Sequence, residues 1–197
     1  MINQDSFDKQ RNILKTISVG AYKVGASNFR SGKFFNYPGI VLGGINNKNI
    51  FFNKVPSEYD IAEIEIIIKV DDLYLDNRKE NKLDYYLGIE CPKVGIENPK
   101  GDINLCVEDN CSSGDLLIFS KLTDLNFENI ELQIEENITH SGTLKNLRFT
   151  LHEIFLDSLK IIKSNDFTIP KPFWLATGGV SDVFPLKKDS LINFIYE

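Results

Sequence analysis

The sequence predicts an all-β fold: an antiparallel β-sandwich, or a jelly-roll or barrel-like domain, with long loops and little helix. Three segments indicate it. Residues 63–70 (EIEIIIKV) alternate apolar and polar side chains, and residues 130–134 (IELQI) and 146–152 (NLRFTLH) repeat the pattern. A period of two is typical of strands, because successive side chains point to opposite faces of a sheet. We therefore expect one face of each strand to be buried and the other to meet water.

The remaining elements follow from apolar runs that lie between turn signals. Segments such as residues 43–48 (GGINNK) and 112–115 (SSGD) are typical of hairpins and Greek-key connections. No segment shows a convincing helical period. About ten strands at this spacing indicate a sandwich, jelly roll or barrel. The expected strands are 17–24, 39–45, 49–53, 62–70, 84–90, 103–107, 116–121, 130–135, 144–152 and 156–163, with weaker ones at 173–176 and 191–196.

Length and composition predict one domain over residues 1–197. The chain has 42% hydrophobic and 25% charged residues, which is typical of globular proteins. Residues 1–16 are polar and predict an N-terminal arm or a short helix. Residues 164–197 contain several prolines and glycines and predict a loop-rich C-terminal arm.

Charge and cysteine content restrict the partners and the compartment. The net charge of −6 and the scattered basic residues argue against nucleic acid as a partner. No run approaches the roughly 20 apolar residues that cross a bilayer, so no membrane is expected either. The N-terminus lacks the pattern of a secretory signal, and three cysteines do not suggest a disulfide framework. We expect synthesis in the cytoplasm.

No motif for a cofactor or a metal is convincing. Residues 25–33 (GASNFRSGK) depart from a phosphate-binding loop, because six residues separate the glycines and Phe34 follows the lysine. Cys106 and Cys111 have no second pair to complete a zinc site, although the sequence leaves open whether they bind anything. The acids of residues 108–115 do not match a calcium-binding EF-hand loop. No cofactor and no metal ligand are therefore assigned.

Catalytic residues are not evident either. His140 lies in an expected turn and His152 on the wet face of an expected strand, and neither belongs to a nucleophile motif. No catalytic residue is assigned, and the chain is not expected to be an enzyme. Carboxylates from the loops of residues 91–115 leave a hydrolase as the third alternative.

The leading hypothesis is a structural subunit of a multi-chain assembly, such as a capsid, tail or accessory protein of a virus or phage particle. It would associate with other protein subunits, identical or different, and the protein could reside in the virion. The second hypothesis is a carbohydrate- or ligand-binding β-sandwich module. Adjacent aromatic residues favour some apolar contact surface. The expected partner contacts are Phe173, Trp174, Phe184, Phe194, Tyr196 and Ile67.

Ile67 is on this list because it breaks the alternation. It falls on the same strand face as Glu65 and Lys69, which is otherwise polar. A solvated face would leave Ile67 in water. A second layer, a loop or a neighbouring subunit is therefore expected to cover it.

Overall fold

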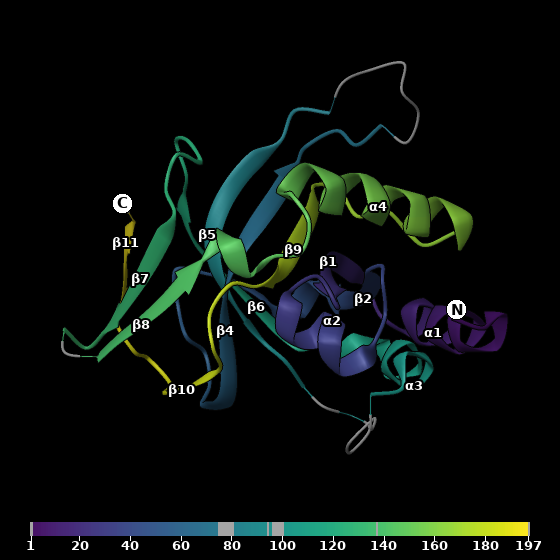
Figure 1. The fold of residues 1–197 in the computed structure, drawn as a ribbon, viewed down its shortest axis with the longest axis horizontal. Coiled ribbons are helices and arrows are strands. Elements are labelled where there is room, and N and C mark those ends of the chain that lie inside the picture. Colours follow the sequence, from purple (N-terminus) through teal and green to yellow (C-terminus); the bar gives the residue numbers. More distant parts are fainter. Residues whose placement is uncertain (1, 75–80, 94, 96–100, 137, 197) are drawn as a thin grey trace.

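The computed structural model describes residues 2–74, 81–93, 95, 101–136 and 138–196. These residues form a mostly β structure whose larger sheet curls into a half-barrel (Figure 1). The strands are β1 (Val19–Gly25), β2 (Val41–Asn46), β3 (Ile50–Phe52), β4 (Tyr59–Val70), β5 (Asp84–Cys91), β6 (Asp115–Lys121), β7 (Asn129–Ile134), β8 (Ile138–Thr143), β9 (Phe173–Gly179), β10 (Phe184–Leu186) and β11 (Ile192–Tyr196). The α-helices are α1 (Gln4–Thr16), α2 (Phe29–Phe35), α3 (Ile103–Glu108) and α4 (Leu151–Ser164), and short 3-10 turns are η1 (Asn47–Asn49), η2 (Asn110–Ser112) and η3 (Leu144–Asn146).

The larger sheet is mixed, so the expectation of a purely antiparallel sandwich is wrong. Its strand order is β2-β1-β9-β4-β5-β6-β3, and β10 pairs with β4. β1 runs parallel to β9, and β3 runs parallel to β6. Parallel neighbours need long connections, and the chain between β1 and β9 runs from α2 through α4. A smaller antiparallel sheet, β11-β7-β8, stands beside the half-barrel (Figure 1).

The strand expected at residues 62–70 is confirmed as part of β4, but neither of its faces is wet. Ile64, Ile66 and Ile68 lie in the main core, which β4 shares with α4 and the smaller sheet. On the opposite face Glu65 is only 1% exposed and Ile67 is fully buried. The expectation of a solvated face is therefore wrong.

A second hydrophobic cluster covers Ile67. Because its members come from strands β1, β2, β4, β6 and β9, the sheet must curl around it, and we call it the interior cluster. Ile67 is thus covered by the chain's own half-barrel. The buried members of the interior cluster are Ala21, Ile45, Ile67, Leu116, Ile118, Trp174 and Ala176.

Two of the expected strands, 144–152 and 156–163, are replaced by η3 and the helix α4. The helix begins where the hydroxyl of Thr150 accepts a hydrogen bond from the Glu153 amide and Glu153 reaches back to the Thr150 amide. This capping box stabilises a helix start. Leu151, Ile154, Phe155 and Ile162 then bury one helical face. The expectation that no convincing helix exists is wrong because this period of three to four residues was read as a period of two.

Other elements compare with the expected ones as follows: α2, α3, β8 and β10 were not expected, whereas α1 was one of two alternatives. Residues 103–107, expected as a strand, form α3, which Asp102 caps by accepting a 2.8 Å hydrogen bond from the Asn104 amide. Residues 4–16 form the helix α1, which is one of the two alternatives expected for residues 1–16. Strands β8 and β10 were not expected, and His140 lies in β8 rather than in a turn. In the described part of the chain, no helix is both long and apolar enough to span a membrane.

Candidate metal centre

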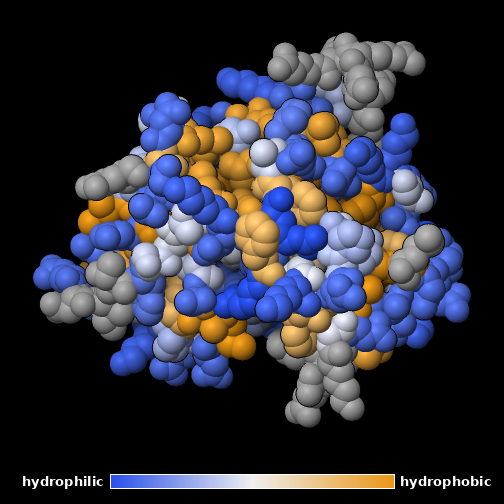
Figure 2. Space-filling model, viewed as in Figure 1, coloured by the Kyte–Doolittle hydropathy of each residue, from blue (hydrophilic) through white to orange (hydrophobic). Residues whose placement is uncertain are grey.

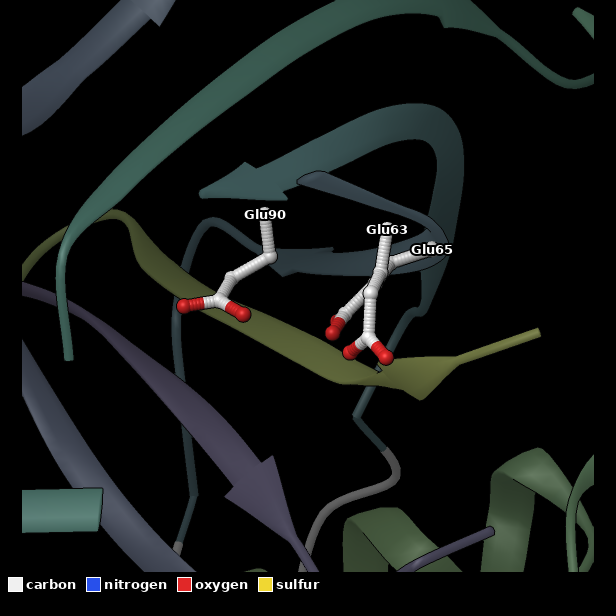
Figure 3. A group of neighbouring side chains, drawn as sticks. All are labelled: Glu63, Glu65 and Glu90. Carbon is white, nitrogen blue, oxygen red and sulfur yellow. The ribbon is translucent and has the colours of Figure 1, made fainter. Parts of the chain in front are cut away.

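Three glutamates from two neighbouring strands converge on one side of the larger sheet. Glu63 and Glu65 are two residues apart on β4, and Glu63 pairs in register with Glu90 on β5. Both relations place side chains on a common face. Figure 3 shows all three projecting to the same side, and ligand oxygens from the three lie within 4.8 Å of one another. We call this group the acid cluster.

The acid cluster is electrostatically unfavourable without a partner. The side chains of Glu65 and Glu90 are almost fully buried, and Glu63 is partly exposed. Burial, together with the charge of Glu90, raises the pKa of Glu65 well above its ordinary value. Burial also raises the pKa of Glu90, although Lys23 opposes this shift. Like charges directly opposite on paired strands destabilise a sheet, so a compensating positive charge is required.

Lys23 supplies part of that charge. It extends from β1, and its Nζ lies 2.9 Å from Oε1 of Glu90. Burial alone would lower the pKa of Lys23, but the charges of Glu90 and Glu65 outweigh it and raise the pKa above its ordinary value. Lys23 is therefore an ammonium group at neutral pH. The other carboxylate oxygen of Glu90, Oε2, is buried and has no hydrogen-bond partner among the described residues.

Two glycines at the end of β9 leave room for the carboxylates. The amide of Gly178 donates a 3.0 Å hydrogen bond to Oε2 of Glu65. Gly178 has φ +108°, a conformation that L side chains rarely adopt. A Cβ atom on Gly179 would lie 2.7 Å from the carboxylate of Glu63. The backbone of β9 thus passes close to two of the three acids.

Arg30 marks the exposed side of the acid cluster. Its guanidinium forms an ion pair with Glu63 and lies 3.4 Å from Asp182, and its side chain is 49% exposed. A cavity of about 240 Å³ opens beside it, lined by residues 28–30, Asn146, Gly179, Ser181 and Asp182. A small molecule in this cavity would lie against Arg30 and Gly179, next to Glu63.

The acid cluster fits a divalent cation. Carboxylate oxygens are the ligands that Mg²⁺, Mn²⁺ and Ca²⁺ prefer. The unpartnered Oε2 of Glu90 and the raised pKa values of Glu65 and Glu90 are what a missing positive charge would produce. Among the described residues, these three glutamates are the potential ligands whose oxygens lie close enough together to share one ion. Glu63, Glu65 and Glu90 would hold the ion.

The cysteine pair considered from the sequence lies elsewhere. Cys106 and Cys111 are buried and free, and their thiols are hydrogen-bonding partners. Cys111 also donates to the carbonyl oxygen of Leu42 at 3.1 Å. They belong to a small apolar cluster between α3, β2 and the end of β1. In the part of the chain that the structure describes, no histidine or acid joins them to form a metal-ligand group.

The residues expected to contact partners do not form one surface. Ile67, Phe173 and Phe184 are buried in this chain's own clusters, and Trp174 is 6% exposed. Phe194 is half-buried, and Tyr196 is 38% exposed. Figure 2 shows one face of the molecule, on which hydrophilic side chains break the hydrophobic surface into separate areas. A role for these residues in subunit contacts stays a prediction.

The sequence reasoning missed the acid cluster, although its signal is present. Glu63 and Glu65 were assigned to water, while Ile67 on the same face already indicated burial. Two acids and an isoleucine on one buried face predict a buried acidic site. The third ligand, Glu90, ends the apolar run of β5, but only the strand pairing places it opposite Glu63.

Comparison with known proteins identifies the fold. No family model matches the sequence, and no curated protein does. 4-Oxalocrotonate decarboxylase from Pseudomonas putida G7, solved with magnesium and adipate, has a TM-score of 0.75 at 15% identity over 98% of this chain and 81% of its own. A fumarylacetoacetate hydrolase family protein from Yersinia pestis CO92 has a TM-score of 0.58 at 13% identity over 90% of this chain and 88% of its own. The fold is that of fumarylacetoacetate hydrolase family proteins.

A third similar structure carries a different metal. Maleylpyruvate hydrolase from Sphingobium sp. SYK-6, solved with manganese(II) and pyruvate, has a TM-score of 0.53 at 11% identity over 90% of this chain and 66% of its own.

Metabolic enzymes thus share the fold, and this corrects the interpretation from sequence. The virus or phage particle protein, its virion location and the non-enzymatic role are wrong, and the carbohydrate-binding alternative is set aside with them. The cytoplasmic location stays a prediction.

Proposed function

We propose that this chain is a divalent-cation-dependent enzyme that acts on a small oxo acid, breaking or rearranging a bond next to its carbonyl group. The observation that carries the proposal is the acid cluster, in which three carboxylates meet and two are buried. Evolution rarely retains such an arrangement for stability alone, since it disfavours folding without a cation. The similar structures add a direction, because one is a decarboxylase with magnesium and adipate and another a hydrolase with manganese and pyruvate.

The chain's own residues supply the rest of the chemistry. A cation held by Glu63, Glu65 and Glu90 would polarise the carbonyl oxygen of an oxo acid and stabilise the negative charge that develops there. Lys23 is protonated and buried beside Glu90, so it would add a positive charge or donate a proton, and it would not act as a base. The cavity beside Arg30 would admit the substrate and limit its size.

Metal binding tests the first half of the proposal. We expect the wild-type protein, stripped with a chelator, to bind one Mn²⁺ or Mg²⁺ in isothermal titration calorimetry. Glu65→Gln keeps an acceptor for the Gly178 amide but removes a ligand charge, and it should weaken binding by at least about tenfold. Glu131→Gln, an exposed acid on β7, is the control and should bind as the wild type does. Equal affinity in wild type and Glu65→Gln would contradict the assignment.

Turnover tests the second half. The Mn²⁺-loaded protein would be incubated with a panel of 2-oxo diacids and acylpyruvates, with product formation followed by mass spectrometry and by release of pyruvate or carbon dioxide. We expect at least one member of the panel to react, and we expect the reaction to stop with a chelator or with Glu65→Gln. A reaction that continues in both conditions would exclude the acid cluster as its centre.

A further inference from the structure

We propose that Arg30 is a gate on the acid cluster: it pairs with Glu63 in the metal-free protein and, once a cation binds, turns to recognise a carboxylate of the substrate. The inference rests on the proposed function and deepens it, because it specifies a substrate with a second anionic group. Three features of the structure carry it. They are the anchoring of α2, the competition for Glu63 and the cavity that Arg30 lines.

The backbone of Arg30 is held beside the acid cluster. Arg30 is the second residue of α2, and the preceding Asn28 is 7% exposed. The Asn28 side chain accepts a 2.8 Å hydrogen bond from the Ser31 amide and donates a 3.0 Å hydrogen bond to the carbonyl oxygen of Gly179. The start of α2 is thereby tied to the end of β9, whose Gly178 contacts Glu65. The side chain of Arg30 is about half exposed, so it can reorient when its ion pairs with Glu63 and Asp182 break, while its backbone stays in place.

Arg30 and a cation would compete for the same carboxylate. Glu63 is the least buried member of the acid cluster and the member that Arg30 contacts. The side chain of Arg30 is 49% exposed and that of Glu63 16%, and an ion pair that solvent reaches is weakened by screening and by the ordering of a long side chain. A divalent cation with three carboxylate ligands would therefore displace the guanidinium from Glu63 without much resistance. Removing the guanidinium should make cation binding slightly stronger.

A displaced Arg30 remains at the cavity. It lines the space of about 240 Å³ together with uncharged groups of Asn28, Asn146 and Ser181. The cavity's other charged side chain, Asp182, is fully exposed. A guanidinium binds carboxylates through two parallel hydrogen bonds. A short diacid could then place its oxo-acid end at the cation and its second carboxylate at Arg30.

The test compares Mn²⁺ affinity with ligand affinity in the same variants. In isothermal titration calorimetry, Arg30→Gln should bind Mn²⁺ about two- to fivefold more tightly than wild type, because a competing ion pair is gone. In the Mn²⁺-loaded protein, the same variant should bind 2-oxoadipate roughly tenfold or more weakly, since a charge-assisted contact is lost. Its affinity for pyruvate, which has no second carboxylate, should stay within about twofold.

Two further variants serve as controls. Lys33→Gln removes an exposed positive charge from the same helix, and it should change all three affinities by less than about twofold because solvent ions screen it. Arg30→Lys keeps the charge but not the planar fork, so it should lose part of the 2-oxoadipate affinity while binding Mn²⁺ nearly as wild type does. Thermal unfolding of each variant establishes that it is folded before titration.

The outcomes separate the two proposals. An unchanged or weaker Mn²⁺ affinity in Arg30→Gln would overturn the gate, and an equal loss for pyruvate and 2-oxoadipate would overturn the carboxylate recognition. Both would leave the metal-dependent function in place. A wild-type protein that binds no Mn²⁺ would overturn the proposed function, and the gate with it.

Discussion

At the scale of single residues, Glu65 shows most directly how stability and function oppose each other. It is 1% exposed, and its pKa is raised well above the ordinary value by burial and by the charge of Glu90. The folded, metal-free protein therefore takes up a proton at Glu65 more readily than the unfolded chain does. The resulting stabilisation is complete at acid pH and is lost as the pH rises through the raised pKa. A bound cation would reverse this preference.

The variant Glu65→Gln should show, through its Tm, how much the charge of Glu65 destabilises the metal-free fold. Above the raised pKa of Glu65 and without metal, we expect the variant to unfold a few degrees above wild type, since 1 kcal/mol corresponds to roughly 2–4 °C in a domain of this size. As the pH falls through that raised pKa the advantage should shrink, because Glu65 of the wild type becomes protonated and loses its charge. The measurement is the difference in Tm between the two proteins as a function of pH. A difference that is independent of pH would show that Glu65 is not strained by its charge.

Acidification should also weaken metal binding. A cation requires the ionised carboxylates, so protons compete with it wherever the pKa values of Glu65 and Glu90 are raised. Mn²⁺ affinity is therefore expected to fall steadily from about pH 7 toward about pH 4.5. Titration calorimetry in buffers of different ionisation enthalpy would count the protons released. Release of none at neutral pH would contradict the raised pKa values.

At the scale of elements, the end of β9 is built around the acid cluster. Gly178 contributes its amide to Glu65, and Gly179 passes so close to Glu63 that a Cβ atom would collide with the carboxylate. The colliding atoms are the far end of a flexible side chain, so Glu63 can move aside at small cost to the fold. It cannot move aside and keep its place as a ligand.

Gly179→Ala should therefore separate folding from metal binding. We expect Tm to stay within a few degrees of wild type, while Mn²⁺ affinity falls by about tenfold or more because one of three ligands is displaced. Gly39→Ala, which would meet the Tyr37 ring at 3.2 Å in the loop before β2, is the control for an added methyl group outside β9 and the acid cluster. If Gly179→Ala binds Mn²⁺ as the wild type does, Glu63 is not a required ligand.

At the scale of the whole molecule, the acid cluster and the apolar interior cluster lie in different parts of the half-barrel. Gly178 and Gly179, at one end of β9, meet the acid cluster, and Trp174, near the other end, belongs to the interior cluster. The Trp174 ring contacts Phe52 and Tyr86, with centroid distances of 5.8 and 5.2 Å, and Lys69 lies over it. Trp174 therefore closes the interior at the end away from the proposed metal.

Trp174→Ala should lower the free energy of unfolding by about 3–5 kcal/mol, because it removes a large buried side chain. Phe52→Ala should cost much less, since Phe52 is 55% exposed. Denaturant unfolding measures both changes. Mn²⁺ affinity of the folded Trp174→Ala protein should match that of wild type, because the substitution lies at the other end of β9. A selective loss of metal binding would show that the two ends are coupled.

The sequence by itself determined most strands of the larger sheet, though not β10. The signals were the period-two alternation of residues 63–70 and apolar runs between turn signals, such as residues 84–90. It did not determine α4, although Thr150 and Glu153 form a helix-start signal, because a short apolar period can be read in two ways. Nor did it determine the acid cluster or the function. Glu90 meets Glu63 only through strand pairing, and Lys23 reaches Glu90 only because the sheet curls. Local periodicity fixes which way a side chain points, whereas tertiary structure decides what it meets there.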